Sequence, residues 1–358
     1  METKIFRFLT AKGLKSWELL TAKFLKETSR VYDYYPPSSA SNILIEKNIL
    51  ENFQKRHHYF SLTKPLVGKV SSSLEDIQIT QKLLIDAYQV FDDPFMLEQV
   101  TGEILAKVLA YRNLKKGMLL YLPWITGNQT DLIPFEVDRV FNLWKNMLAF
   151  GLRPVDKRHS SLLLFRGTDL SLLSQSSRIS IISNFDPKGP GFSVFNHSKK
   201  RLHEWMESTT KKNHKVKVIG YSLGGALASY LLLDQPSFFS ENSCSLLFHQ
   251  PGLTDKNFEK FQKAQEEHPF KVRSFIAEGD PVSKYGKLFC ETIGLRLQEK
   301  VLMPFEAHTQ LFCALHNLEA RRIHIENENL SLSRDFYSKL HAKTSKILFR
   351  LGINHFLP

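Results

Sequence analysis

The fold is decided by one stretch of the sequence, Lys217-Val-Ile-Gly-Tyr-Ser-Leu-Gly-Gly-Ala-Leu-Ala228. An apolar strand leads into the pattern G-x-S-x-G, and a helix rich in small residues follows. A serine at such a strand-to-helix elbow is held in a strained backbone conformation, and small neighbours such as Gly220 and Gly224 let the helix and strand pack closely. Its hydroxyl lies near a helix N-terminus, where N–H groups stabilise negative charge. The stretch therefore predicts Ser222 as a nucleophile; the alternative is a chance match in a glycine-bearing turn.

Apolar strands and helices alternate on both sides of this elbow. We expect strands at 150–154, 161–165, 215–219, 244–248 and 271–277, and helices at 197–211, 223–233 and 255–266. Strands separated by helices of about ten to fifteen residues imply right-handed crossover connections and a sheet covered on both faces. The pattern thus predicts an α/β fold with a mostly parallel sheet flanked by helices.

The N-terminal part of the chain has a different pattern. Apolar residues at helical spacing predict one helix over 74–91 and a second over 94–111. We expect a further helix at 135–149. The chain is therefore expected to divide into a helical N-terminal region, 1–125, and an α/β domain, 126–358.

A nucleophilic serine needs a base, and the base needs a carboxylate that orients it. In hydrolases built on this elbow the order along the chain is serine, carboxylate, histidine. Asp280 follows the apolar strand at 271–277, at the edge where parallel sheets place their sites, and is the expected acid. Two alternatives stay open: Asp280 is a solvent-facing residue of an Asp-Pro turn, or Asp255, which opens a polar helix, is the acid.

Three histidines are candidates for the base. His308 follows Asp280 in a loop-like stretch with apolar neighbours, and His316 and His324 lie further along the chain. We favour His308, partly on the resemblance described below. The chain contains 13 histidines, so the alternative for any one of them is a surface or packing role.

An oxyanion hole is expected before the elbow. The segment Leu162-Leu-Leu-Phe-Arg-Gly-Thr-Asp169 is an apolar strand that ends in Arg-Gly-Thr. It brings backbone N–H groups and a hydroxyl to the same sheet edge as the serine. Thr168, through its hydroxyl and amide, and the amide of Leu223 are suitable donors to an oxyanion. An ordinary strand-ending turn is the alternative.

Together these segments resemble the class 3 lipases, the family of fungal triacylglycerol lipases with the α/β-hydrolase fold. The resemblance covers about residues 148–310, and its motifs are Phe165-Arg-Gly-Thr168, Gly191-Phe192, Gly220-Tyr-Ser-Leu-Gly-Gly-Ala-Leu-Ala228 and Asp280-Pro-Val282. Many members have histidine where this chain has Tyr221. The resemblance implies Ser222 as nucleophile, Asp280 as acid, His308 as base, and Thr168 with Leu223 as oxyanion hole.

The expected activity is hydrolysis of a lipid ester, an acylglycerol or a phospholipid, through an acyl-enzyme. It requires no cofactor. Two other interpretations remain: a non-catalytic lipid- or protein-binding module on the same fold, and a lipid acyltransferase that passes the acyl group to an alcohol.

The charge and composition of the chain limit the classes of partner that it is expected to bind. With 48 Lys+Arg and 36 Asp+Glu among 358 residues, the net charge is 48 − 36 = +12, which favours anionic partners. The basic residues are spread along the chain without a nucleic-acid-binding motif, so we expect peripheral contact with an anionic membrane surface and no nucleic acid. The sequence has no nucleotide- or metal-binding motif, and its 3 widely spaced cysteines do not suggest a disulfide framework or a zinc site.

No signal peptide or transmembrane helix is expected. The first twenty residues lack a continuous apolar region, and the longest uncharged stretch, Val218–Leu233, is shorter than the roughly 20 residues that cross a bilayer. The protein is therefore expected to be cytoplasmic or exported without a leader.

Two segments are candidates for lipid contact. Residues 170–184 mix Leu, Ile and Ser where the resembling family has its lid; a strand that extends the sheet is the alternative. Residues 335–352 predict a basic amphipathic helix, which either lies on a membrane or packs its apolar side on the sheet.

Overall fold

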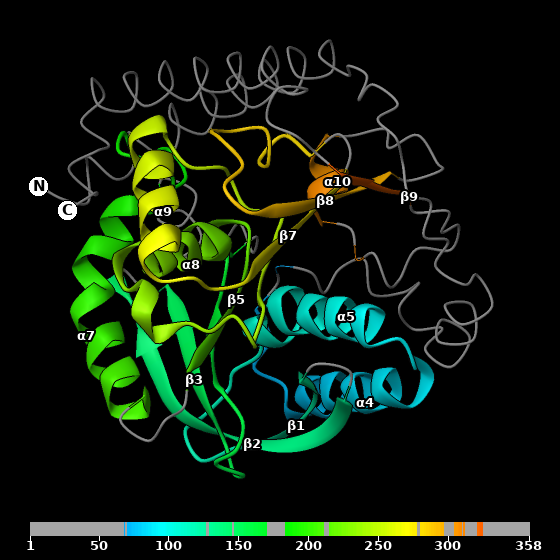
Figure 1. Cartoon of the computed structure of the whole chain (residues 1–358). Helices are drawn as coiled ribbons and strands as arrows, with labels where there is room; N and C mark the ends of the chain where they lie inside the picture. The colour runs from blue at the N-terminus through cyan, green and yellow to red at the C-terminus, as the bar shows by residue number, and fades with distance from the viewer. Residues whose placement is uncertain are drawn as a thin grey trace, which may run out of the picture.

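Figure 1 shows the computed structural model of the chain. The structure describes residues 68, 70–126, 129–144, 147–169, 183–210, 215–277, 280–296, 304–309, 311 and 321–324. The expected lid at 170–184 lies outside the described residues except for its last two, and the expected amphipathic helix at 335–352 lies outside them entirely. In the described part of the chain, no helix has the length and apolar character needed to cross a membrane.

The described strands form one nine-stranded sheet, in which they stand side by side in the order of the sequence. The strands are β1 (Leu119–Thr126), β2 (Gln129–Asn142), β3 (Leu148–Pro154), β4 (Ser161–Phe165), β5 (Val216–Tyr221), β6 (Ser245–Phe248), β7 (Val272–Ala277), β8 (Glu291–Arg296) and β9 (Arg321–His324). Strands β4 to β8 run parallel, and antiparallel pairs extend the sheet at both edges. The predicted α/β fold with a parallel sheet and flanking helices is confirmed.

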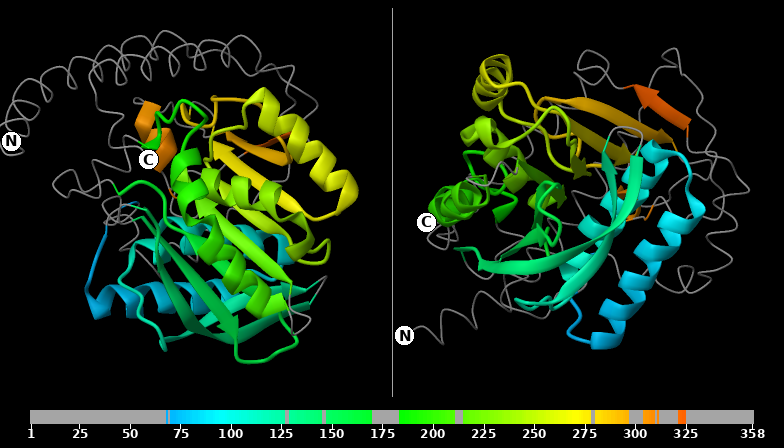
Figure 2. Two further views of the ribbon diagram at one scale, coloured as in Figure 1. Left: turned by 90° about the vertical axis from the view of Figure 1, so that its left-hand side faces the viewer. Right: turned by 60° about the horizontal axis from the view of Figure 1, so that its bottom comes forward.

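Helices cover both faces of the sheet, as Figures 1 and 2 show. One face carries α7 (Phe192–Thr210), α8 (Leu223–Asp234) and α9 (Asp255–Glu267), and the opposite face carries α4 (Leu74–Val90) and α5 (Pro94–Lys107). Because the parallel strands advance in one direction and crossovers are right-handed, the crossover helices all lie on the same face. The N-terminal helices therefore bury the face that the crossovers leave open. The short helices among the described residues are η1 (Leu109–Tyr111), η3 (Pro236–Phe238) and α10 (Pro304–Thr309).

Helix α5 packs closely on the centre of the sheet. Gly102 makes this approach possible, because a Cβ atom there would lie 2.5 Å from Cδ1 of Leu246 in β6. Glu98 forms ion pairs with Lys217 of β5 at 2.9 Å and with Arg273 of β7 at 3.2 Å. The helix is thus joined to the parallel strands by apolar packing and by charge. The expected division after residue 125 falls inside β1.

The helix expected at 135–149 is wrong, because residues Gln129–Asn142 form β2. Ile133, Phe135 and Val137 are buried and alternate with more exposed residues. This period of two is typical of a strand with one covered face. Pairing with β1 and β3 decides the conformation, which the apolar spacing in the sequence left ambiguous.

Candidate active site

Ser222 occupies the elbow between β5 and α8. Its backbone has φ 55° and ψ −126°, a conformation that costs a non-glycine residue about 1–3 kcal/mol. A Cβ atom on Gly220 would lie 2.5 Å from the carbonyl oxygen of Gly224, and one on Gly224 would lie 2.6 Å from that of Phe165. Glycine at both positions is therefore what allows α8 to begin directly behind the strand.

Three side chains distant in the sequence meet at this elbow. Nε2 of His308 lies 2.8 Å from Oγ of Ser222, and Nδ1 of His308 lies 3.0 Å from Oδ1 of Asp280. They are separated by 86 and 28 residues along the chain. A carboxylate only accepts hydrogen bonds, so Nδ1 of His308 carries the proton and Nε2 accepts the serine hydroxyl. The structure thus brings together all three residues that the sequence predicted.

Asp280 is fully buried just beyond the carboxyl end of β7. Oδ1 also accepts from the amide of Val282 at 2.9 Å, and Oδ2 contacts Nδ1 of His249 at 2.8 Å. Burial alone raises the pKa of Asp280, but the attraction of His308 and the hydrogen bonds from His249 and His308 outweigh it. The pKa is therefore held well below its ordinary value, and the carboxylate is charged.

His308 is positioned by Tyr221, the last residue of β5. The Tyr221 hydroxyl donates to the backbone carbonyl of His308 at 2.8 Å, and the two rings stack with centroids 5.1 Å apart. Tyr221 is fully buried, and burial raises the pKa of its phenol well above the ordinary value. The sequence marked this position only as a departure from the resembling family; its contact with the histidine depends on the fold.

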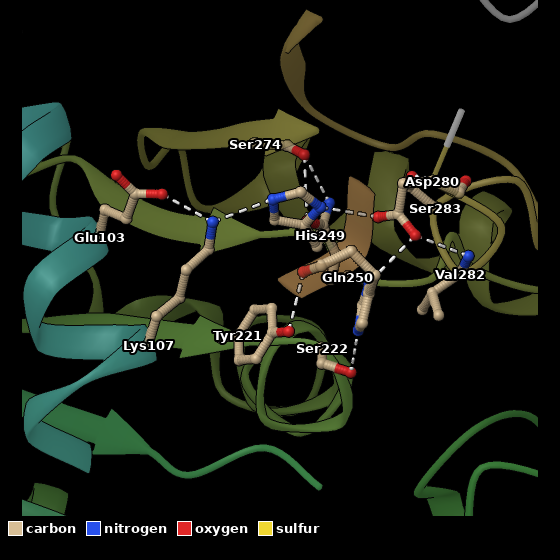
Figure 3. A network of polar contacts seen from close by, with 11 residues as sticks. Glu103, Lys107, Tyr221, Ser222, His249, Gln250, Ser274, Asp280, Val282 and Ser283 are labelled. Carbon is tan, nitrogen blue, oxygen red and sulfur yellow. Dashed lines mark hydrogen bonds and ion pairs between the residues drawn. The ribbon is translucent and has the colours of Figure 1, made fainter. Parts of the chain in front are cut away.

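His249 is a residue of the site that the sequence analysis missed. It follows β6 directly and is fully buried, with its Nε2 atom 3.0 Å from Nζ of Lys107 (Figure 3). Burial, and next the charge of Lys107, lower the pKa of His249 to about 3. Its position after a buried parallel strand, at the same sheet edge as Ser222, was the available signal.

The segment after β4 lies against the elbow. A Cβ atom on Gly167 would lie 2.7 Å from the Tyr111 hydroxyl and 3.4 Å from Cβ of Ser222. Thr168 is buried, and its Oγ1 accepts a hydrogen bond from Nδ2 of Asn184 at 3.0 Å. Because Oγ1 of Thr168 accepts this hydrogen bond, the hydroxyl proton of Thr168 points away from Asn184 and can be donated to another acceptor. Leu223, the other expected donor, is the first residue of α8.

The alternative acid lies away from Ser222, and the side chains of the alternative bases lie outside the described residues. Asp255 opens α9, forms an ion pair with Lys287 at 3.1 Å and has a side chain that is 77% exposed. His316 and the side chain of His324 lie outside the described residues. Asp280 and His308 are thus the pair that meets Ser222.

One group among the described residues has the composition of a metal site, namely His249, Asp280 and His308. A metal would need an unprotonated nitrogen from each imidazole. Both Nδ1 atoms face the Asp280 carboxylate, so binding there would break the contacts of the site just described.

The sequence and the fold were compared with known proteins. Residues 144–289 match the family described as Lipase (class 3); no curated protein matches the chain. His308 lies beyond the matched segment, and α4 and α5 lie before it.

Several solved structures are similar to this one. The Rhizomucor miehei lipase propeptide complex, in a deletion mutant, is 16% identical with a TM-score of 0.33, covering 49% of this chain and 64% of that chain. Lipase II from Rhizopus niveus is 20% identical with a TM-score of 0.31, covering 45% and 66%. A mutant form of MDLA from Penicillium cyclopium is 13% identical with a TM-score of 0.40, covering 76% and 96%.

The match thus spans less than two thirds of the Rhizomucor and Rhizopus chains. The family segment contains the elbow, strands β4 to β7 and Asp280. The chain therefore has an α/β fold of the lipase-like α/β-hydrolase type, and its residues 144–289 match the class 3 lipase family.

Proposed function

We propose that the chain is a serine ester hydrolase that acts on lipid esters through Ser222, His308 and Asp280. The observation that carries this proposal is the continuous contact from Ser222 Oγ to His308 Nε2, at 2.8 Å, and from His308 Nδ1 to Asp280 Oδ1, at 3.0 Å. This is the order nucleophile, base and orienting acid that nucleophilic catalysis requires. The match of residues 144–289 to the class 3 lipase family supports the same reaction class.

The reaction proceeds in two steps. Ser222 Oγ attacks the ester carbonyl carbon while its proton passes to Nε2 of His308, and the carbonyl oxygen becomes an oxyanion. The amides of Thr168 and Leu223, with the Thr168 hydroxyl, are the proposed donors to it. As the ester bond breaks, His308 gives its proton to the leaving alcohol. His308 then removes a proton from water as the water oxygen attacks the acyl carbon. It returns this proton to Ser222 Oγ as the bond between Oγ and the acyl carbon breaks, which releases the acid and restores the free serine.

The substrate class is proposed to be lipid esters, acylglycerols or phospholipids. The match of residues 144–289 to a lipase family supports this assignment. The net charge of +12 favours anionic lipid surfaces over neutral ones. Sedimentation with vesicles of neutral phospholipid, with and without an anionic phospholipid, measures this preference. Equal binding to both vesicle types, or binding to neither, would contradict membrane contact through charge.

Activity is tested with a short and a long p-nitrophenyl ester, for wild type and Ser222→Ala. We expect turnover by wild type alone, and covalent labelling by a fluorophosphonate on the peptide that contains Ser222. Equal rates for the two proteins, or labelling elsewhere, would contradict the proposal. A wild type with no turnover and no labelling would favour a non-catalytic binding module. Product analysis with an added alcohol or sterol separates hydrolysis from acyl transfer: new esters in place of free acid would indicate an acyltransferase.

A further inference from the structure

A chain of four buried polar side chains runs from α5 to the proposed acid. Nζ of Lys107 lies 2.6 Å from Oε1 of Glu103 and 3.0 Å from Nε2 of His249, and Nδ1 of His249 lies 2.8 Å from Oδ2 of Asp280 (Figure 3). All four residues have 0% exposure. Glu103 and Lys107 belong to a helix that precedes the family segment 144–289.

The hydrogen bonds among these four side chains fix which nitrogen of His249 carries the proton. The Lys107 ammonium has only protons to offer, so Nε2 of His249 accepts with its lone pair. In a neutral imidazole the proton is then on Nδ1, which faces Oδ2 of Asp280. His249 therefore donates to the carboxylate oxygen that His308 does not contact.

The backbone at His249 is held in an unusual conformation. Among the described residues, the non-glycine residues with positive φ are Ser222, at 55°, and His249, at 51°. They follow the neighbouring strands β5 and β6, and the amide of His249 continues the sheet by donating to the carbonyl of Phe275 at 2.8 Å. Strain of this kind persists where the surroundings enforce it, and it concentrates at functional sites. At His249 it directs the ring toward Asp280.

Resting on the proposed function, we propose that His249 is a positioning residue for the reaction. It holds Oδ2 of Asp280 so that Oδ1 stays on His308, and Lys107 keeps the His249 imidazole in its neutral form with the proton on Nδ1. Helix α5 thereby becomes part of the catalytic apparatus.

The charges of the four side chains explain why a lysine is suited to the position next to His249. A doubly protonated His249 would neutralise Asp280 and remove the negative charge that stabilises His308 when it takes the serine proton. The neighbouring ammonium opposes that protonation, and Glu103 compensates the ammonium in the buried interior. Among the described residues, Asp280, His308, Lys107 and the Tyr221 ring are titratable groups that face His249.

Two substitutions of His249 separate the donor to Asp280 from the contact with Lys107. In His249→Asn the amide nitrogen replaces Nδ1 as donor, and asparagine tolerates a positive φ. In His249→Gln the longer side chain reaches toward Lys107 but has no donor at the Nδ1 position. We expect kcat to fall about 10- to 100-fold in His249→Gln with KM unchanged, the range found when metal-bound histidines lose their orienting partners. His249→Asn should recover most of the loss.

The role of Lys107 is tested by replacing the ion pair as a unit, in Glu103→Leu/Lys107→Met. Removing both charges leaves no buried ion unpaired. Histidine ¹⁵N NMR is recorded on this variant and on the parent, each carrying Ser222→Ala so that the readout does not depend on activity. In the parent we expect His249 neutral with its proton on Nδ1 between about pH 5 and pH 8. In the variant, protonation of His249 should move to higher pH. In the same Glu103→Leu/Lys107→Met protein with Ser222 intact, kcat should decline more steeply on acidification than in wild type.

Each outcome bears on the proposal, with rates normalised to sites titrated by the fluorophosphonate. Equal kcat in His249→Gln, His249→Asn and wild type would overturn the positioning role, even if both variants melt at a lower temperature than wild type. A proton on Nε2 of His249, or an unchanged titration without Lys107, would overturn the role of the helix. A wild type that neither turns over esters nor takes the label refutes the proposed function, and the positioning role with it.

Discussion

Asp280→Asn perturbs the site most sharply, because it changes charge without changing shape. Oδ1 of Asp280 accepts from His308 Nδ1 and the Val282 amide, and Oδ2 accepts from His249 Nδ1. The single oxygen of asparagine is best used at the position with two donors. Its amide nitrogen then faces the proton on His249. Exchanging the His249 tautomer gives no relief, because a proton on Nε2 would face the ammonium of Lys107.

Two effects follow, one on rate and one on stability. Loss of the carboxylate leaves the His308 imidazolium without its counter-charge, and in serine triads this substitution lowers kcat by about 10⁴-fold. Two buried donors left facing each other cost about 1–3 kcal/mol each in free energy of unfolding. We therefore expect Asp280→Asn to be both nearly inactive and clearly less stable than wild type.

The assays are p-nitrophenyl ester turnover and urea unfolding at neutral pH. Ser283→Ala is the matched control, because the Ser283 hydroxyl donates to the backbone carbonyl of Asp280 at 3.3 Å and does not touch the carboxylate. The control should lose about 1 kcal/mol and keep a kcat close to that of wild type. Wild-type stability in Asp280→Asn would refute the assigned donors, and a kcat within tenfold of wild type would refute the role of the carboxylate.

Three further predictions concern single positions. Burial lowers the pKa of His249 to about 3 in the folded protein, whereas an unfolded histidine has a pKa of about 6.5. Below about pH 6.5 the unfolded state therefore takes up a proton that the folded state does not, so the free energy of unfolding falls as the pH is lowered. Wild type should lose about 2 kcal/mol more than His249→Asn between pH 7 and pH 5 in urea unfolding; parallel pH profiles would contradict a neutral buried imidazole. Gly224→Ala would bring a Cβ atom to 2.6 Å from the backbone oxygen of Phe165 and should cost about 1–3 kcal/mol in thermal unfolding. A variant as stable as wild type would show that the elbow is less tightly packed. Thr168→Val should lower kcat about 10²- to 10³-fold by removing an oxyanion donor, whereas Thr168→Ser keeps the hydroxyl; equal kcat in both would exclude the hydroxyl from that role.

Local sequence patterns predicted most of the strands and helices of the α/β part of the fold. The strands β4 to β7 and the helices α7 to α9 were predictable because each buried strand is a short apolar run and each helix shows its own periodicity. The segment 135–149 was not, because its apolar residues fit a helix as well as a strand, and pairing with β1 and β3 settled the matter.

The candidate site divides in the same way. Ser222 and Asp280 are visible in the sequence, because an elbow and a strand-ending turn are local features with their own residue signatures. His308 required a choice among several histidines, and its contact with Ser222 closes a separation of 86 residues.

The sequence by itself determined the elbow at Ser222, the parallel strands of the core and the strand-ending turn that holds Asp280. Each of these features depends on short-range sterics and on the burial of nearby residues. The tertiary structure alone decided that α5 covers the free face of the sheet and that Lys107 meets His249 across 142 residues. Such contacts leave no local periodicity, since they depend on how the chain closes on itself. A buried lysine in a helix and a histidine after a strand have separate patterns in the sequence, and only the fold makes them neighbours.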